Sequence, residues 1–346
     1  MVRNGLRLAV FEHADAAAAT ESAESASAGS AAAPAAEPPV ILFVHGYPDS
    51  HATWDEVLAR LGPGVRTVRY DVRGAGASDA PRSLRGYRLD ELADDLFAVA
   101  DTVSPDRPVH LVAHDWGSIQ SWHAATDPRA PRRIASFTSI SGPCLDHTGY
   151  WFRERFRHPS PRRSAQLLRQ GSKSWYIYAF HVPFAAPLLW RYWLAKAWPD
   201  LLRRTEGIEP GPRRPQPTLQ RDAIRGIGLY RANMLPHLLR PEFRYAHIPV
   251  QLISPTRDRF VSPALADGLE HWAPDLRRHT LACGHWGALT RAAPELAERI
   301  MAFVDEVERA GTLPGDAGGD TGGDADEARS EGGDGDGGGG EAGPRG

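Results

Sequence analysis

The chain of 346 residues has 42% hydrophobic residues and a formal net charge of −3, which allows one large domain or two modest ones with a sizeable core. No run of about 18 uninterrupted apolar residues occurs, so we expect no membrane span. The arginines are spread along the chain, so we expect no nucleic-acid-binding patch. Two cysteines, Cys144 and Cys283, and the lack of a signal-peptide pattern predict a reduced, cytoplasmic protein without disulfides. The oligomeric state stays open.

Two segments of low complexity divide the chain. Residues 14–39 are mostly Ala, Ser, Glu and Pro, and residues 311–346 are rich in Gly and Asp. Such compositions bury too little apolar surface to offset the entropy of ordering. We therefore predict a disordered insert over 14–39 and a disordered tail over 311–346. Residues 1–13 should hold the first strand of the core, from Gly5 to Glu12.

Strands and helices alternate from residue 40 to residue 141, the first part of the predicted core. Apolar runs and their periodicity predict the strands Val40–Val44, Val65–Tyr70, Val109–Val112 and Ile134–Ile140, with helices from Thr53 to Arg60, from Leu92 to Val103 and from Gly117 to Thr126. Thr53 and Glu56 have the spacing of a capping box at a helix start. This alternation predicts an α/β fold with a mostly parallel sheet and helices on both faces.

The alternation stops over residues 142–240, where aromatic residues, prolines and arginines are frequent. It resumes over 241–310, the second part of the core, with the strands Pro249–Ser254 and Arg277–Leu281 and the helices Pro263–Trp272 and Pro294–Val307. Open α/β sheets bind ligands at the carboxyl ends of their strands. An insertion between two parts of one sheet would lie there, so we predict a helical lid over 142–240.

The predicted lid is rich in aromatic side chains. They are Trp175, Tyr178, Phe180, Phe184, Trp190, Tyr192, Trp193 and Trp198. These rings could line a large apolar substrate pocket, or they could be the apolar face of an amphipathic helix packed on the core.

Asp115 is the main candidate for a nucleophile, in the segment Ala113-His114-Asp115-Trp116-Gly117 between a strand and a helix. Hydrolases place a nucleophile at such a strand–turn–helix, written G-x-S-x-G; here Asp replaces Ser, and Ala113 replaces the first Gly. The backbone N–H of Trp116, at the helix start, would face developing negative charge. The alternative role for Asp115 is a helix N-cap.

Asp258 and His285 complete the chain order nucleophile, acid, histidine. Each lies just past a predicted strand, so the three side chains can converge in one cleft. An ionised Asp115 needs no base to attack saturated carbon, and His285, oriented by Asp258, would activate the water that hydrolyses the resulting ester. Asp222 and Asp267 are nearby carboxylates that follow no strand end. The alternative for His285 is a loop histidine with a satisfied ring.

Three motifs resemble those of epoxide hydrolases, a branch of the α/β-hydrolase fold family. They are His45-Gly46-Tyr47-Pro48, His114-Asp115-Trp116-Gly117 and Cys283-Gly284-His285-Trp286. The resemblance covers roughly residues 5–308 apart from the 14–39 insert. It implies hydrolysis of a small apolar epoxide to a vicinal diol without a cofactor, and it implies that Tyr47 supplies the second oxyanion-hole N–H. The region also resembles the hydrolase part of bacterial proteins that fuse such a domain to a short-chain dehydrogenase.

The same family places two lid tyrosines over the nucleophile, where they donate protons to the epoxide oxygen. Tyr230, in Leu229-Tyr230-Arg231, resembles the second of them, and Tyr176, four residues before Phe180, resembles the first. Tyr178 and Tyr192 are competing lid tyrosines. Buried tyrosines are usually core residues whose hydroxyl has a partner.

The nearest competing function is a haloalkane or haloacid dehalogenase, which shares the fold and the Asp nucleophile but needs halide-binding groups instead of acid tyrosines. Haloalkane dehalogenases commonly have Asn where this chain has Tyr47. Fluoroacetate dehalogenases resemble the pair Trp175-Tyr176, but they place arginines after the nucleophile, where this chain has Trp116 and Ile119.

Two further functions are disfavoured by the sequence. A non-catalytic binding protein on a hydrolase scaffold would not require Asp258 and His285 together. The segment from Asp71 to Gly76 lacks the third Gly of a dinucleotide fingerprint, and no cluster with metal-ligand spacing occurs, so we expect no metal.

Overall fold

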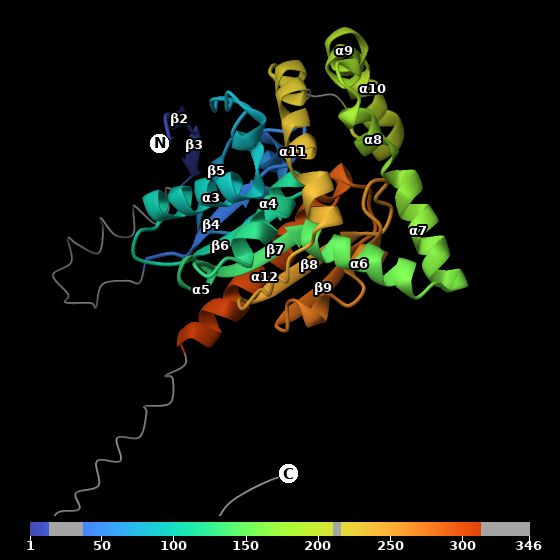
Figure 1. Ribbon diagram of the computed structural model, residues 1–346. Helices are drawn as coiled ribbons and strands as arrows, with labels where there is room; N and C mark the ends of the chain where they lie inside the picture. Colours follow the sequence, from blue (N-terminus) through green and yellow to red (C-terminus); the bar gives the residue numbers. More distant parts are fainter. Residues whose placement is uncertain (14–36, 210–215, 313–346) are drawn as a thin grey trace, which may run out of the picture.

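The computed structural model describes residues 1–13, 37–209 and 216–312. Its centre is a seven-stranded sheet in the order β3-β5-β4-β6-β7-β8-β9 (Figure 1). These strands are β3 Val10–His13, β4 Val40–Val44, β5 Arg66–Tyr70, β6 Val109–His114, β7 Ile134–Ile140, β8 Val250–Pro255 and β9 Leu276–Leu281. β3 pairs with β5 in antiparallel orientation, and the other neighbours are parallel. The predicted fold class is confirmed.

Helices cover both faces of the sheet because its central strands are apolar on both sides. Successive side chains of a strand point to opposite faces; in β4, Leu42 faces one core cluster and Phe43 faces the other. The first cluster includes Leu92 and Trp122, from α3 and α4, and the second includes Leu296, from α12. The bounds are α2 Asp55–Leu58, α3 Leu89–Val103, α4 Trp116–Ala125, α5 Ala130–Arg133 and α12 Ala293–Thr312.

The amino-terminal strand differs from the prediction of one strand over Gly5 to Glu12. The chain forms a small antiparallel pair, β1 Val2–Arg3 and β2 Leu6–Arg7, before β3 begins at Val10. Asn4 and Gly5 between them have φ of 48° and 74°. An Asn-Gly pair with positive φ is a two-residue hairpin turn, and it splits the predicted strand.

Two predicted helices also differ. Thr53 does not cap a helix: it lies inside the 3₁₀ turn η1 His51–Trp54, whose N-cap is Ser50. The helix predicted over Pro263–Trp272 is two 3₁₀ turns, η4 Pro263–Ala266 and η5 Leu269–His271, because Gly268 between them has a φ of +78°. Two more 3₁₀ turns are η2 Leu84–Tyr87 and η6 Trp286–Leu289.

The disorder predictions fall mostly outside the described residues. Residues 14–36 and 313–346 are not described. Helix α12 continues to Thr312, two residues into the segment predicted to be a disordered tail.

Between β7 and β8 the chain forms a set of helices, which we call the inserted helices. They are α6 Leu145–Arg157, α7 Pro161–Lys173, α8 Trp175–His181, α9 Ala185–Leu189, the π-helical turn η3 Trp190–Leu194, α10 Ala195–Glu206 and α11 Leu219–Leu239. In Figure 1, α8, α9 and α10 lie together at the upper right, beyond the edge of the sheet. No helix among the described residues is long and apolar enough to cross a membrane.

Candidate active site

Asp115 lies in a sharp turn between β6 and α4, with φ 53° and ψ −124°. A non-glycine residue rarely adopts such a positive φ. Two glycines leave room for the turn: a Cβ on Gly117 would lie 2.2 Å from the carbonyl oxygen of Val44, and a Cβ on Gly46 would lie 2.5 Å from the Cβ of Asp115. The predicted strand–turn–helix around Asp115 is therefore present, at the carboxyl end of β6.

The two carboxylate oxygens of Asp115 have different neighbours. The backbone N–H of Tyr47 donates a hydrogen bond to Oδ1 (2.8 Å), whereas Nε2 of His285 lies 3.6 Å from Oδ2. Burial raises the pKa of Asp115, but the adjacent His285 and the Tyr47 N–H outweigh burial and hold this pKa below its usual value. Asp115 is therefore an anion at neutral pH, and Oδ2 is the oxygen that faces His285.

Asp258 and His285 form the pair that the sequence predicts. Nδ1 of His285 lies 2.9 Å from Oδ2 of Asp258, and the N–H groups of Phe260 and Val261 donate to Oδ1 of Asp258 at 2.7 and 2.9 Å. Although burial opposes it, the neighbouring His285 lowers the pKa of Asp258 to about 2. Burial likewise opposes protonation of His285, but Asp258 and Asp115 together raise its pKa to about 10. His285 is thus held between two carboxylates.

The competing carboxylates lie elsewhere. Oδ2 of Asp222 accepts a hydrogen bond from the N–H of Gly76 (2.8 Å) and fixes that loop. Asp267 pairs with Arg155 at 2.8 Å. The structure therefore brings together Asp115, Asp258 and His285, whereas Asp222 and Asp267 have these other partners.

Tyr47 and Trp116, the predicted oxyanion-hole residues, flank Asp115. The N–H of Tyr47 already faces the carboxylate, and its hydroxyl donates to the carbonyl oxygen of Ala223 on α11 (3.0 Å), which anchors the loop to the inserted helices. Trp116 is the first residue of α4, so its N–H is one of those that a helix start leaves without an intrahelical partner.

Tyr176 and Tyr230 reach this place from two inserted helices. The ring of Tyr230, on α11, lies 4.8 Å from that of Trp116 and 5.3 Å from that of Tyr47. The ring of Tyr176, on α8, lies 5.9 Å from that of Tyr230 and 5.5 Å from that of Phe260. Burial, reinforced by nearby anions such as Asp115, raises the pKa of both hydroxyls. Both tyrosines are therefore protonated at neutral pH.

The competing tyrosines point away from the site. Tyr178 and Tyr192 are exposed, at 71% and 67%. Of the lid aromatics, Phe180, Trp190 and Trp198 are buried, and the others are exposed to solvent. The exposed rings therefore fit neither of the two alternatives, a pocket lining or an apolar helix face packed on the core, because they face solvent.

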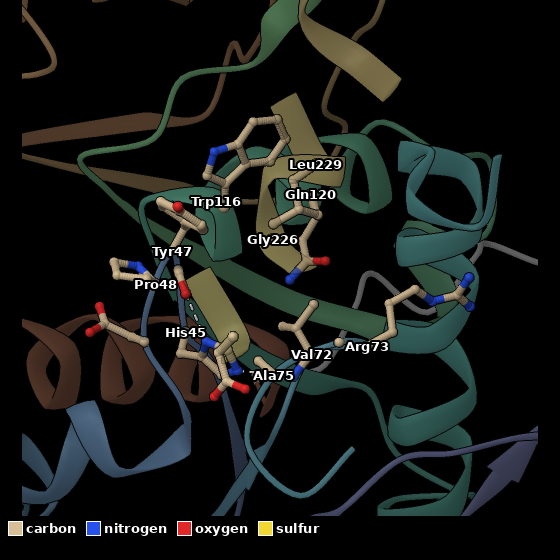
Figure 2. Close-up of a pocket in the computed structure, with 14 residues that line it drawn as sticks. His45, Tyr47, Pro48, Val72, Arg73, Ala75, Trp116, Gln120, Gly226 and Leu229 are labelled. Carbon is tan, nitrogen blue, oxygen red and sulfur yellow. Dashed lines mark hydrogen bonds between the residues drawn. The ribbon is translucent and has the colours of Figure 1, made fainter. Parts of the chain in front are cut away.

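A small pocket lies beside the site. It is bounded by the His45–Asp49 loop, by residues 72–75, by α4 and by α11. Figure 2 shows Trp116 and Gln120 from α4 opposite Val72, with Gly226 and Leu229 from α11 along one side. The residues that line it include Tyr47 and Trp116, which flank Asp115, but not Asp115 itself.

The sequence did not single out two buried groups that hold the histidine loop. Nε2 of His114 lies 3.1 Å from the carbonyl oxygen of His285, and burial lowers the pKa of His114 to about 3, so its neutral ring is the donor. Glu206, the last residue of α10, accepts a hydrogen bond from the N–H of Gly287 (3.4 Å), and burial raises its pKa. An acidic residue at a helix carboxyl terminus opposes the helix dipole, which is the sequence signal that marks Glu206.

Among the described residues, no group of three or more His, Cys, Asp or Glu side chains could hold a metal ion. Cys144 and Cys283 are both buried and free.

A family model described as "alpha/beta hydrolase fold" matches residues 39–292. The chain therefore belongs to the α/β-hydrolase fold family.

Two curated proteins illustrate the similarity of this chain to individual relatives. The chain is 36% identical over 273 residues to "Probable oxidoreductase EphD" of Mycobacterium tuberculosis, covering 77% of this chain but 46% of that protein. It is 32% identical over 146 residues to human "Epoxide hydrolase 4", covering 42% of this chain and 36% of the relative. The chain thus spans less than half the length of these curated relatives.

Solved structures show the same fold. An epoxide hydrolase from Bacillus megaterium superposes with a TM-score of 0.67 at 21% identity, covering 87% of this chain and 98% of that one. An epoxide hydrolase from Vigna radiata gives 0.63 at 22%, covering 88% and 95%. Proteins named epoxide hydrolase are thus among both the curated relatives and the solved structures to which this chain is similar.

Proposed function

We propose that this protein hydrolyses epoxides to vicinal diols through a covalent ester on Asp115. One observation carries the proposal: a single buried carboxylate meets a backbone donor on one oxygen and His285 on the other, beneath two protonated tyrosines. The relatives named as epoxide hydrolases support the same reaction.

In the first step, Oδ2 of Asp115 attacks one carbon of the epoxide ring. The C–O bond of the ring breaks, and the oxygen that leaves takes a proton from Tyr176 or Tyr230 as its charge develops. An alkoxide is a poor leaving group, so a positioned acid is typically worth about 10²–10⁴-fold in rate. The product of this step is an ester between Asp115 and the substrate.

In the second step, water attacks the ester carbonyl. Ester formation removes the negative charge of Asp115, one of the two charges that raise the pKa of His285. The imidazolium can then pass its proton to the tyrosinate and act as a base toward water. Oδ1, which accepts from the Tyr47 N–H, becomes the oxyanion of the tetrahedral intermediate, stabilised by the N–H groups of Tyr47 and Trp116. Its collapse breaks the bond between the ester carbonyl carbon and the diol oxygen. That oxygen takes the proton that His285 gained from water, and the proton of the new Asp115 carboxyl returns to His285, so the diol leaves and the site is restored.

The inserted helices act as the lid in this proposal. Tyr176, Tyr230 and Phe180 lie over the nucleophile, with the rings of Phe180 and Tyr230 4.9 Å apart. In this proposal α8 and α11 move apart to admit the substrate. The rings around Asp115 favour an apolar substrate.

A dehalogenase fits the site less well. The pair Trp175-Tyr176 resembles a Trp–Tyr pair of fluoroacetate dehalogenases. Trp175, however, is 67% exposed and points away from Asp115. A halide leaves as a stable anion and needs no acid, which would leave Tyr176 and Tyr230 without a chemical role.

The test is turnover of a small panel of aryl and aliphatic epoxides, with diol formation followed by chromatography, beside a matched panel of haloalkanes followed by halide release. We expect diol from the wild type and none from Asp115→Ala. Halide release without diol formation would overturn the proposal in favour of a dehalogenase, and no turnover of either panel would favour a binding protein.

A further inference from the structure

Helix α8 is apolar on two sides. Tyr176 and Phe180, four residues apart, face the site, where their rings lie 5.7 Å apart. Trp175 and Tyr178, three residues apart, are 67% and 71% exposed. A helix that is hydrophobic all round is normally buried. Here one side covers the active site, and the other side faces solvent.

The exposed apolar side continues along the chain beyond α8. Phe184 is 78% exposed, Tyr192 is 67% and Trp193 is 61%. We call this set the outer aromatic face: Trp175, Tyr178, Val182, Phe184, Leu188, Leu189, Tyr192 and Trp193, all exposed. Its residues lie on α8, α9 and η3 and in the short connection from α8 to α9. Helix α9 contacts both α8 and η3, and α8 and α9 lie at the upper right of Figure 1. Large contiguous apolar patches are rare on monomeric proteins and mark interaction sites.

Basic residues outnumber acidic ones in the part of the chain that carries this face. Residues 161–204 contain eight basic residues and one acidic residue, Asp200. Arg191 and Lys196 are exposed and flank the pair Tyr192-Trp193 in sequence. The basic residues are Arg162, Arg163, Arg169, Lys173, Arg191, Lys196, Arg203 and Arg204.

We propose that the outer aromatic face docks on an anionic lipid surface. Trp and Tyr prefer the boundary between headgroups and acyl chains. Aromatic and leucine side chains beside Arg and Lys form the composition of segments that lie in a membrane interface without crossing it. The attraction of each basic residue to an anionic leaflet adds to the apolar contribution.

A second copy of this chain is a less suitable partner for the outer aromatic face than an anionic membrane. A two-fold interface places the same patch on both subunits, which would bring Arg191 and Lys196 of one copy near those of the other. Like charges across an interface oppose association. An anionic membrane supplies the opposite charge together with an apolar layer.

Docking would also bring the membrane close to the path by which a substrate reaches the site. Trp175 and Tyr176 are neighbours on α8, one facing outward and one facing the site, so one helix separates the docking surface from the nucleophile. This consequence rests on the proposed function, since it applies to an apolar epoxide dissolved in the lipid. The docking itself does not depend on that chemistry.

The experiment is vesicle binding by the full chain without substrate, measured by co-sedimentation and by quenching of tryptophan fluorescence with brominated lipid. The vesicles contain phosphatidylcholine alone or phosphatidylcholine mixed with phosphatidylglycerol. We expect binding to the mixed vesicles, weakened by salt because exposed charges are screened. Phe184→Ser combined with Trp193→Ser should lower the partition coefficient on the order of tenfold or more. Arg191→Gln combined with Lys196→Gln should lower it by about fivefold for each charge removed.

The matched control is Phe243→Ser, which removes an equally exposed aromatic side chain, at 71%, outside the outer aromatic face; it should bind like the wild type. Thermal unfolding of each variant establishes that it is folded. The proposal is overturned if the wild type ignores mixed vesicles or if folded Phe184→Ser, Trp193→Ser binds them as the wild type does. It is also overturned if sedimentation shows a wild-type dimer that the same double variant abolishes without any vesicle binding, because the face is then a protein interface.

Discussion

The two halves of the candidate site are held in different ways. The half on the sheet, with Asp115, Asp258 and His285, lies at strand ends and is fixed by short hydrogen bonds, such as those that Phe260 and Val261 donate to Asp258. The half on the inserted helices, with Tyr176 and Tyr230, is held mainly by ring contacts. Hydrogen bonds at strand ends fix an atom's position closely, whereas ring packing tolerates sliding.

We infer from this difference that the two halves have different roles in the proposed reaction. The groups that form and break covalent bonds need a fixed geometry and stay on the rigid sheet. In the proposed reaction, the acids that assist the epoxide oxygen can lie on helices that open to admit substrate. The following predictions test whether the two halves separate in this way, from the largest effect to the smallest.

Removing the nucleophile should have the largest effect. Asp115→Ala should lower epoxide turnover by about 10⁴-fold or more, because no other group can form the ester. The side chain lies at a turn that already favours small residues, so the variant should fold. The measurement is diol formation beside near-ultraviolet circular dichroism, and normal turnover by the folded variant would contradict the assignment.

Removing the hydroxyls of Tyr176 and Tyr230 should have the next largest effect and should slow only the first step, the alkylation of Asp115. Tyr230→Phe should slow alkylation of Asp115, and Tyr176→Phe combined with Tyr230→Phe should slow it by about 10²–10⁴-fold. Slow activity on a haloalkane, if present, should be retained. Tyr178→Phe is the matched control, since Tyr178 is 71% exposed on the same helix. Equal loss on both substrate classes would mean that the tyrosines only shape the site.

A smaller effect should follow from the contact between α10 and the histidine loop. Glu206→Ala removes the acceptor for the buried Gly287 N–H, which costs about 1–3 kcal/mol of unfolding free energy. We expect hydrolysis of the ester to slow more than its formation, since the loop carries His285. Glu206→Gln keeps an acceptor and should stay close to the wild type. Identical behaviour of the Ala and Gln variants would refute this positioning role.

The last effect acts on stability and not directly on turnover, and it depends on pH. The pKa of His285 is raised from 6.5 to about 10, so its contribution to stability is fully present below about pH 6.5 and is lost as the pH rises toward 10. The pKa of Asp258 is lowered from 3.8 to about 2, so its contribution is present above 3.8 and is lost as the pH falls toward 2. Chemical denaturation across this range should show both losses. In His285→Gln the alkaline loss should shrink, and an unchanged alkaline profile would argue against the raised pKa.

The sheet and its half of the site could be predicted from the sequence because strand ends are local signals. The strand–turn–helix around Asp115 and the positions of Asp258 and His285 after β8 and β9 follow from short apolar runs. The split of the first strand at Asn4-Gly5 was missed although the pair carries a turn signal. Gly268 similarly divides a predicted helix.

The inserted helices were harder to predict because their arrangement depends on contacts between distant segments. Which of Tyr176 and Tyr178 faces the site depends on the orientation of α8, and only the motif resemblance favoured Tyr176. The burial of Glu206 and the exposure of Trp193 are likewise tertiary properties. Local periodicity does not encode which side of an all-apolar helix meets the core.

The most direct test of the covalent mechanism is a single turnover in water labelled with ¹⁸O, with enzyme in excess over epoxide. If Asp115 attacks the epoxide, the first diol carries no label, because its new oxygen comes from the carboxylate. The label then enters Asp115 and appears in the mass of the peptide that contains it. Labelled diol together with an unlabelled Asp115 peptide would show that water attacks the epoxide directly, and would contradict the central claim.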